Sequence, residues 1–248
     1  MSQVNPYVVA LIPARSGSKG VQNKNLRLLQ NRSLLDWSIG AAIESQVISR
    51  IVVSTNSVDY AQAAKQAGAE VPFLRPESIS QDKSTDLEFV KHALDFFSTE
   101  GKTPDIIIHL RPTTPFRDPK MMDQAILAGL QSRIDVTSIR SVHKMNESAY
   151  KSFEISDSGN LVSTFTKIRE LDPANEGRQS FPTTYSPNGY IDLLYPDFIQ
   201  KSGLLHGDNV WPVVTENTIE IDDEFDLDLA KALLTTSPEI FQRIFGGE

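Results

Sequence analysis

Short, uninterrupted apolar runs constrain this chain more than any other feature of its sequence. Residues 7–12 (YVVALI), 50–54 (RIVVS) and 105–110 (DIIIHL) are too short to cross a membrane as helices. They also lack the polar alternation of a strand that has one face in water. Such runs are typical of strands that are covered on both faces, as in a parallel sheet. They therefore predict a central sheet buried between two layers.

Segments of helical periodicity alternate with these runs. Residues 34–45, 60–67, 85–97, 121–130 and 224–234 place apolar side chains at intervals of three and four. Further short strands are predicted at 71–74, 135–139, 189–195 and 218–221. Strands that alternate with helices predict an α/β fold, in which a mainly parallel sheet carries helices on both faces.

The alternation is interrupted in the second half of the chain. Residues 151–168 contain two alternating stretches around a turn at 157–160 (DSGN), and a polar segment follows them. We interpret 141–187 as an insertion, a hairpin plus a loop that projects from the core. Residues 1–140 and 188–248 then form the core, and 248 residues are sufficient for one large domain of this kind.

Composition excludes several classes of protein. The chain has no cysteine, so it cannot form disulfides, thiolate metal sites or a catalytic thiol. Its formal net charge is −8, without a basic run that would attract nucleic-acid phosphates. No apolar run approaches the ~20 residues of a membrane span, and the first ten residues lack the pattern of a signal peptide. We therefore expect a cytoplasmic protein that binds neither nucleic acid nor a membrane.

The loop after the first strand is the strongest local signal for function. It reads PARSGSKG at 13–20 and continues to Lys24 and Asn25. Its small residues let backbone N–H groups approach an anion, and Arg15, Lys19 and Lys24 add positive charge. Such a loop lies where ligands bind in an open α/β sheet, so a triphosphate is the expected ligand. The spacing matches neither a P-loop nor a dinucleotide motif, and the alternative is an ordinary solvated loop.

This loop resembles the signature of the acylneuraminate cytidylyltransferases, which are the CMP-sialic acid synthetases and their relatives. The resemblance covers nearly the whole chain in the right order, through LIPARSGSKG (11–20), VVSTN (52–56), VPFLRP (71–76), LRPTTPFR (110–117), SPNG (186–189) and IEID (219–222). It implies a Rossmann-like nucleotidyltransferase core with a dimerisation insertion. It also implies a reaction: CMP passes from CTP to the anomeric hydroxyl of an acidic nine-carbon 2-keto sugar, a sialic, legionaminic or related nonulosonic acid, and pyrophosphate is released.

By this resemblance the loop binds CTP. Arg15 and Lys24 hold the phosphates and offset the charge that moves onto the departing pyrophosphate. The nucleotide site includes the loop positions Ala14, Ser16, Gly17, Ser18 and Asn25. The sugar supplies the attacking hydroxyl, so no protein nucleophile is expected and the four histidines receive no role. Of these, His109 is interpreted as a buried core residue.

Two carboxylates near the end of the chain, Glu220 and Asp222, are predicted to hold Mg²⁺. Residues i and i+2 of a strand point to the same face, so both side chains can meet one ion. Mg²⁺ prefers oxygen ligands, commonly one or two carboxylates with phosphates and waters. The alternative is that Asp222 or Asp223 caps the following helix. The resemblance favours the metal, although the family usually carries Asp at the position of Glu220.

Arg111 is a second departure from the family, because sialic acid synthetases usually carry Gln at this position. Its guanidinium can pair bidentately with the carboxylate of a 2-keto sugar acid, so the sugar is held differently or is a different nonulosonic acid. The alternative is a surface salt bridge of little energetic value. Other sugar contacts implied by the resemblance are Thr113, Tyr185 and Asn188, with Lys144 and Lys167 reaching a partner's substrate across a homodimer. For the two lysines, solvated charge on a hairpin is the alternative.

Three other functions remain open at this point. The first is a nucleotidyltransferase that acts on a sugar 1-phosphate with another NTP, because a fold does not fix a function. The second is a non-catalytic sugar-nucleotide-binding protein. A glycosyltransferase ranks last, because the strand at 105–110 is followed by Arg-Pro-Thr rather than by an Asp-x-Asp motif.

Overall fold

The computed structural model describes residues 6–17, 21–132, 136–165 and 171–246. A six-stranded sheet lies at its centre, in the order β10-β6-β9-β5-β1-β4. These strands are β1 (Val8–Pro13), β4 (Arg50–Ser54), β5 (Ile106–His109), β6 (Ser138–Lys144), β9 (Tyr185–Leu194) and β10 (Val210–Thr215). Strand β1 is parallel to β4 and β5, and β10 is parallel to β6, whereas β9 runs antiparallel to β5 and β6. The predicted α/β class with a mostly parallel sheet is confirmed.

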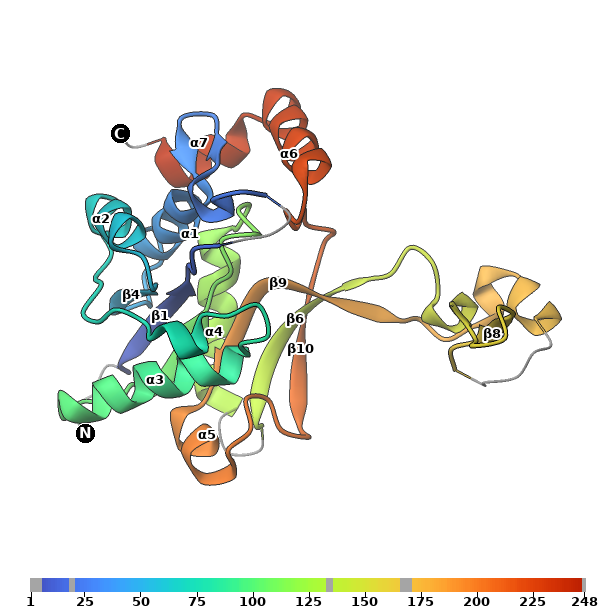
Figure 1. The fold of residues 1–248 in the computed structure, drawn as a ribbon, viewed down its shortest axis with the longest axis horizontal. Coiled ribbons are helices and arrows are strands. Elements are labelled where there is room, and N and C mark those ends of the chain that lie inside the picture. The colour runs from blue at the N-terminus through green and yellow to red at the C-terminus, as the bar shows by residue number, and fades with distance from the viewer. Residues whose placement is uncertain (1–5, 18–20, 133–135, 166–170, 247–248) are drawn as a thin grey trace.

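Helices cover both faces of this sheet (Figure 1). The seven α-helices of the described residues are α1 (Leu34–Ile43), α2 (Val58–Gln66), α3 (Asp86–Thr99), α4 (Pro119–Ser132), α5 (Pro196–Ser202), α6 (Glu224–Thr236) and α7 (Glu239–Phe245). Short 3₁₀ helices are η1 (Lys24–Leu26), η2 (Glu77–Ile79), η3 (Ala149–Lys151), η4 (Asp172–Asn175) and η5 (Arg178–Ser180). A two-stranded ribbon joins β2 (Leu28–Leu29) to β3 (Arg32–Ser33). None of the described helices is both long and apolar enough to span a membrane.

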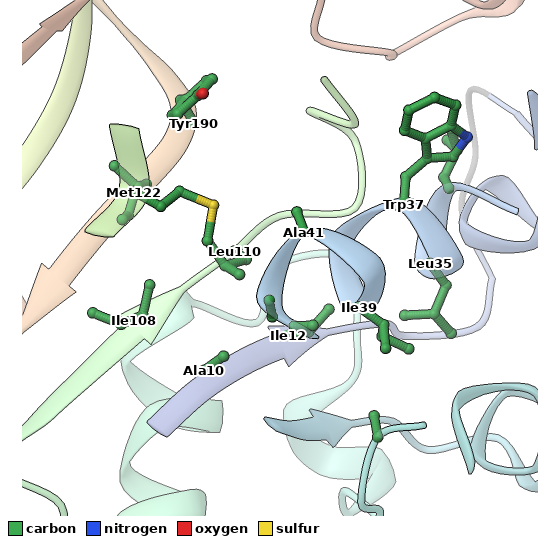
Figure 2. Close-up of a cluster of buried hydrophobic side chains, with 14 of the residues drawn as sticks. Ala10, Ile12, Leu35, Trp37, Ile39, Ala41, Ile108, Leu110, Met122 and Tyr190 are labelled. Atoms are coloured by element: carbon green, nitrogen blue, oxygen red, sulfur yellow. The ribbon is translucent and has the colours of Figure 1, made fainter. Parts of the chain in front are cut away.

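Strand β1 shows why its sequence has no polar alternation. Ala10 and Ile12 face the cluster formed with α1, α4, α6 and α7, which Figure 2 shows around Ile39 of α1. Val9 and Leu11 face a second cluster, formed with α3 and α5. All four side chains are fully buried, so each face of the strand contributes about 1.5–3 kcal/mol for each large aliphatic side chain. A polar residue at any of these positions would lose its water without a partner.

Helix α1 is anchored at its start and in its middle. Ser33 and Asp36 form a capping box, in which each side chain accepts a hydrogen bond from the other residue's backbone N–H. Trp37 is fully buried, and its ring makes edge contacts with Phe116, Phe241 and Phe245. The last two belong to α7, a helix that the sequence pattern did not predict. Helix α7 therefore closes the core beside α1, the first α-helix after the loop that follows β1.

Two predicted strands are wrong. Within residues 71–74 only Leu74 makes an isolated bridge, with Thr55, and the preceding Glu70 makes another with Val52; no ladder forms, because Pro72 has no N–H to contribute. Residues 218–221 belong to no strand, although the N–H of Ile221 donates to the Thr113 carbonyl at 2.7 Å. The predicted strand at 135–139 corresponds to β6, which begins at Ser138, and residue 135 lies outside the described residues.

The projecting segment is shorter than predicted. Strands β6 and β9 stay paired as far as Lys144 and Tyr185, so 141–144 and 185–187 belong to the sheet and the excursion covers 145–184. It reaches well away from the core (Figure 1) and carries a small hairpin of β7 (Phe153–Ile155) and β8 (Leu161–Ser163). The hairpin turns at Gly159, which has a left-handed φ of 78°.

Candidate active site

A cleft of about 430 Å³ opens at the carboxyl ends of β1 and β5. This is where ligands bind in open α/β sheets, because loops diverge from neighbouring parallel strands at that edge. Its lining residues are Pro13, Arg15, Lys24, Asn25, Arg75, Ser84, Thr85, Asp86, Phe89, Arg111, Pro112, Thr113 and Asp222. Among them are Arg15, Lys24, Asn25, Arg111, Thr113 and Asp222, which were predicted from the sequence as site residues.

The phosphate loop is fixed by its own backbone and by β4. The Ala14 N–H donates to the Ser54 carbonyl at 2.9 Å, and both the N–H and the hydroxyl of Ser16 bond to the Asn56 amide oxygen, at 2.9 and 3.2 Å. The Asn25 amide donates to the Arg15 carbonyl at 3.2 Å, and Gly17 adopts a left-handed φ of 83°. Ala14, Ser16 and Gly17 thus shape the loop rather than line the cleft. Predicted Ser18 lies outside the described residues.

Arg15 and Lys24, the two cations of this loop that the structure describes, are each paired with a carboxylate, and Lys19 lies outside the described residues. Arg15 Nη1 lies 3.1 Å from Asp82 Oδ1, and both side chains are partly exposed. Lys24 Nζ donates to Asp222 Oδ1 at 2.9 Å and to the Ile221 carbonyl at 3.0 Å. Ion pairs this exposed contribute at most about 1 kcal/mol, so an incoming polyphosphate can exchange for the carboxylates at little cost.

In the acidic segment before α6, the sequence left open whether Asp222 or Asp223 caps the helix or faces a ligand, and the structure distinguishes the two residues. Asp223 is the N-cap of α6, and its side chain accepts from the Asp226 N–H at 3.0 Å. Asp222 does not cap the helix, so its carboxylate remains at the cleft beside Lys24. Burial raises the pKa of the Glu220 carboxyl, and the negative charge of Asp222 raises it further. The two carboxylates are therefore close enough to repel each other, and of the two only Asp222 lines the cleft.

Arg111 is clamped between two carboxylates from distant parts of the chain. Its Nη2 donates to Asp86 Oδ2 at 2.7 Å, and its Nη1 donates to Asp192 Oδ2 at 2.9 Å. Asp192 lies on β9 and is fully buried. Gly189, with a left-handed φ of 62°, brings the β9 backbone so close that a Cβ there would lie 3.3 Å from Arg111 Cδ. This explains why glycine follows Asn188 in the SPNG motif.

Arg75 is a further arginine that lines the cleft. Its Nε donates to Ser54 Oγ at 3.0 Å and its Nη2 to the Ser54 carbonyl at 2.6 Å, while the guanidinium lies 4.8 Å from the Phe89 ring centre. Burial lowers the pKa of Arg75 to about 10, so the group is still cationic at neutral pH. Arg75, Asp86 and Phe89 were not predicted as site residues. Their only sequence signal was the Arg75-Pro76 dipeptide within the family motif.

The loop after β5 is held by Arg117, which is almost fully buried. Its guanidinium donates to the carbonyls of Tyr190, Arg111 and Gly189 and to the Ser38 hydroxyl, at 2.6–3.0 Å. It thereby joins the loop to β9 and α1. Burial lowers the pKa of Arg117 to about 9, because the charge has lost its water.

Other predicted sugar contacts lie outside this cleft. Asn188 is buried, and its amide donates to Thr215 Oγ1 at 2.6 Å. Lys144 and Tyr185 pair at the far end of β6 and β9, and Lys144 lines a separate hollow of about 350 Å³ formed with the projecting segment. Lys167 lies outside the described residues. The described part of one chain therefore does not bring Lys144 or Tyr185 to the cleft, and the Asn188 side chain is bonded to Thr215 instead.

Comparison with known proteins places this geometry in a family. A sequence model described as Cytidylyltransferase matches residues 9–168, which is more than half of the chain. The chain belongs to the cytidylyltransferase family. The match begins in β1 and includes the phosphate loop, Arg111 and Arg117, whereas Asp222 lies beyond it.

Individual relatives of this cytidylyltransferase support the same family assignment. It is 32% identical over 230 residues to an N-acylneuraminate cytidylyltransferase of Escherichia coli O18:K1:H7, covering 90% of this chain but 51% of the relative. It is 31% identical to the CMP-N,N'-diacetyllegionaminic acid synthase of Legionella pneumophila, covering 94% of this chain and 98% of the relative. The chain thus spans about half the length of the first relative and nearly all of the second.

Solved structures show the same fold at low sequence identity. A CMP:2-keto-3-deoxy-manno-octonic acid synthetase complexed with CTP superposes with a TM-score of 0.68 and 16% identity, covering 93% of this chain and 99% of the other. A 4-diphosphocytidyl-2C-methyl-D-erythritol synthase from Anaerococcus prevotii gives a TM-score of 0.61 at 13% identity, with the same coverage. The Rossmann-like nucleotidyltransferase architecture is confirmed.

Proposed function

We propose that this chain transfers CMP from CTP to the anomeric hydroxyl of an acidic nine-carbon 2-keto sugar, with release of pyrophosphate. The observation that carries the proposal is one cleft that unites the loop cations Arg15 and Lys24 with Asn25 and the carboxylate of Asp222. Relatives named for sialic and legionaminic acids support the substrate class. A fold neighbour complexed with CTP supports the nucleotide. The cytoplasmic location stays a prediction.

The loop cations would stabilise the charge that develops during transfer. As the sugar oxygen bonds to the α-phosphorus, the bond to the β-phosphate breaks and negative charge moves onto pyrophosphate. Arg15 and Lys24 would leave Asp82 and Asp222 to bind the phosphates, since those pairs are exposed and weak. Fixed cations next to the leaving group lower the barrier without rearrangement of solvent. No nucleophilic side chain is required.

The residues at the cleft rim fit Mg²⁺. Glu220 and Asp222 are close enough for the Asp222 charge to raise the Glu220 pKa, and a cation would relieve that repulsion. The described residues contain no group of three or more metal-ligating side chains, and Mg²⁺ bound through one or two carboxylates and substrate phosphates needs no more. When bound, the ion would neutralise phosphate charge. In the ligand-free chain Lys24 occupies the Asp222 carboxylate, and once Lys24 turns to the phosphates this carboxylate would be available to the ion.

We also propose that the chain works as a homodimer through the projecting segment. Apolar side chains are exposed on it, including Ile155, which is 77% exposed, and Phe165, which is 52% exposed. Burying such side chains against a second copy is favourable. Lys144 and Tyr185, remote from the cleft of their own chain, would then act at the cleft of the partner. Sedimentation at micromolar concentration tests this, and a mass near 27.6 kDa would contradict it.

The decisive assay is pyrophosphate release. It should be measured with Mg²⁺, the four NTPs and a panel of sialic, legionaminic and pseudaminic acids and hexose 1-phosphates. Turnover only with CTP and a nonulosonic acid is the expected result. Turnover with a sugar 1-phosphate, or with no pair of substrates, would overturn the proposed substrate. Arg15→Ala should lower turnover by orders of magnitude while the melting temperature stays that of the wild type.

A further inference from the structure

Among the described residues, Asp86 is one of two acidic residues that line the cleft, the other being Asp222. Asp86 is the first residue of α3, directly after the N-cap Thr85, and its side chain is 39% exposed where it lines the cleft. Its Oδ2 accepts from Arg111 Nη2 at 2.7 Å. The helix start and the Arg111 bond together fix the direction of the carboxylate, because the N-terminal end of α3 favours negative charge.

Asp86 is ionised at neutral pH. Burial alone would raise the pKa of its carboxyl, but the neighbouring His109, Arg111 and Arg140 hold that pKa below its usual range. His109 is itself uncharged above a pKa of about 4, so Arg111 is the effective cation at neutral pH. An ionised carboxylate only accepts hydrogen bonds. A ligand group beside it must therefore donate.

Arg111 is held in place by two carboxylates of its own chain. Both terminal nitrogens are already bound, and Asp192, which holds one of them, is fully buried. Removing Arg111 from Asp192 would leave this buried carboxylate with only the longer contact to Arg140 Nε, at 3.6 Å, which is unfavourable. The β9 backbone at Gly189 packs against the Arg111 side chain and hinders it from moving in that direction. Arg111 therefore stays between its two partners, and it holds Asp86 beside it at the wall of the cleft.

We propose that Asp86 is a hydroxyl-binding residue of the substrate cleft and that Arg111 is the residue that positions it. The inference rests on the proposed function, since the ligand is then a polyol, either the ribose of CTP or the acidic sugar. Both carry hydroxyl donors that a fixed carboxylate can accept. A sugar carboxylate is repelled from this part of the cleft, and its charge must be met elsewhere.

The first test compares Asp86→Asn with the wild type, and Asp95→Asn serves as the control. Asp95 lies on the same helix with an exposed side chain and does not line the cleft. Loss of a charge-assisted hydrogen bond should raise one KM by about ten- to a hundred-fold, with kcat changed far less. Asp95→Asn should leave both unchanged. An Asp86→Asn enzyme with both KM values of the wild type would overturn the inference.

The source of the hydroxyl is separated by calorimetric titration with CTP alone and with 2′- and 3′-deoxy-CTP. If the donor is a ribose hydroxyl, wild type should bind one deoxynucleotide about tenfold or more weakly than CTP, and Asp86→Asn should lose this discrimination. If the donor is on the sugar, CTP titrations should be identical and only the sugar KM should rise. Tighter sugar binding by Asp86→Asn would overturn the inference, because it would show Arg111 released to bind the sugar carboxylate.

The positioning role of Arg111 is tested by Arg111→Gln, Arg111→Lys and the double variant Asp86→Asn/Arg111→Gln. If Arg111 acts through Asp86, the double variant should be no worse than Arg111→Gln alone, and lysine should recover part of the lost kcat/KM. Additive effects would exclude the positioning role. Asp86→Asn still tests the hydroxyl site if the Arg111 variants do not fold. A wild-type chain that binds neither CTP nor an acidic sugar would refute the proposed function itself, whereas normal turnover with an unchanged Asp86→Asn refutes only this inference.

Discussion

His109 makes the stability of this protein depend on pH in a way that can be calculated. The residue ends β5, is fully buried and has its ring 5.3 Å from that of Phe89. Among the described residues, neither ring nitrogen has a hydrogen-bond partner, and the nearest carboxylate oxygen, Asp192 Oδ2, is 3.8 Å away. Burial, reinforced by the positive charge of Arg111, lowers the pKa of His109 from 6.5 to about 4.

The sign follows from which state binds the proton first. In the unfolded chain the ring takes up its proton with a pKa near 6.5, whereas in the folded protein it stays mostly neutral down to its lowered pKa of about 4. The unfolded state therefore gains protons first as the pH falls, and the free energy of unfolding decreases across this window. This one group should remove about 2 kcal/mol at pH 5 and about 3 kcal/mol at pH 4, relative to pH 7.5.

Urea unfolding at pH 7.5 and pH 5 measures the effect, with fluorescence of the buried Trp37 as the signal. The matched variant is His109→Leu, which keeps the volume but has no titrating group. It should be at least as stable as the wild type at pH 7.5, because an unpartnered buried polar group is removed. Its loss of stability between pH 7.5 and pH 5 should be smaller by about 2 kcal/mol. Equal losses in both proteins would refute the reasoning, since the remaining carboxylates titrate in both.

Three further predictions concern residues that build the site. Arg117→Met should lower the free energy of unfolding, measured with urea, by about 4 kcal/mol, because the four hydrogen bonds of Arg117 contribute about 1 kcal/mol each. Arg117→Lys should lose less, and a loss below about 1 kcal/mol for Arg117→Met would contradict this. Gly189→Ala should lower stability in thermal unfolding by about 1–3 kcal/mol, because its φ is positive and the new Cβ would lie 3.1 Å from Thr114 Oγ1; an unchanged melting temperature would exclude strain there. Asp222→Asn should reduce the rate of pyrophosphate release by more than about a hundredfold and shift its Mg²⁺ dependence to higher concentration, while the fold stays intact. EDTA should abolish turnover by the wild type. A near wild-type rate for Asp222→Asn would remove Asp222 from the mechanism.

The sequence did not predict features of the strands that depend on their neighbours in the sheet. Strand β10 was not predicted, because Pro212 interrupts its pattern and Trp211 and Val214 are exposed. A proline is tolerated there because β10 is the edge of the sheet, and its place at the edge is known only from the topology. In the same way, nothing local distinguishes β9 as antiparallel, since direction is fixed by the strands on either side of it.

The sequence alone determined what depends on local periodicity and local chemistry. The doubly covered strands, most helices and the phosphate loop with Arg15, Lys24 and Asn25 follow from side-chain pattern and from the spacing of small and cationic residues. Only the tertiary structure decided the state of Arg111, because its partners Asp86 and Asp192 lie 25 and 81 residues away along the chain. An isolated arginine looks available to any anion. Packing of α3 and β9 around it decides that its guanidinium is already paired with two carboxylates, one of which, Asp86, lines the cleft beside it.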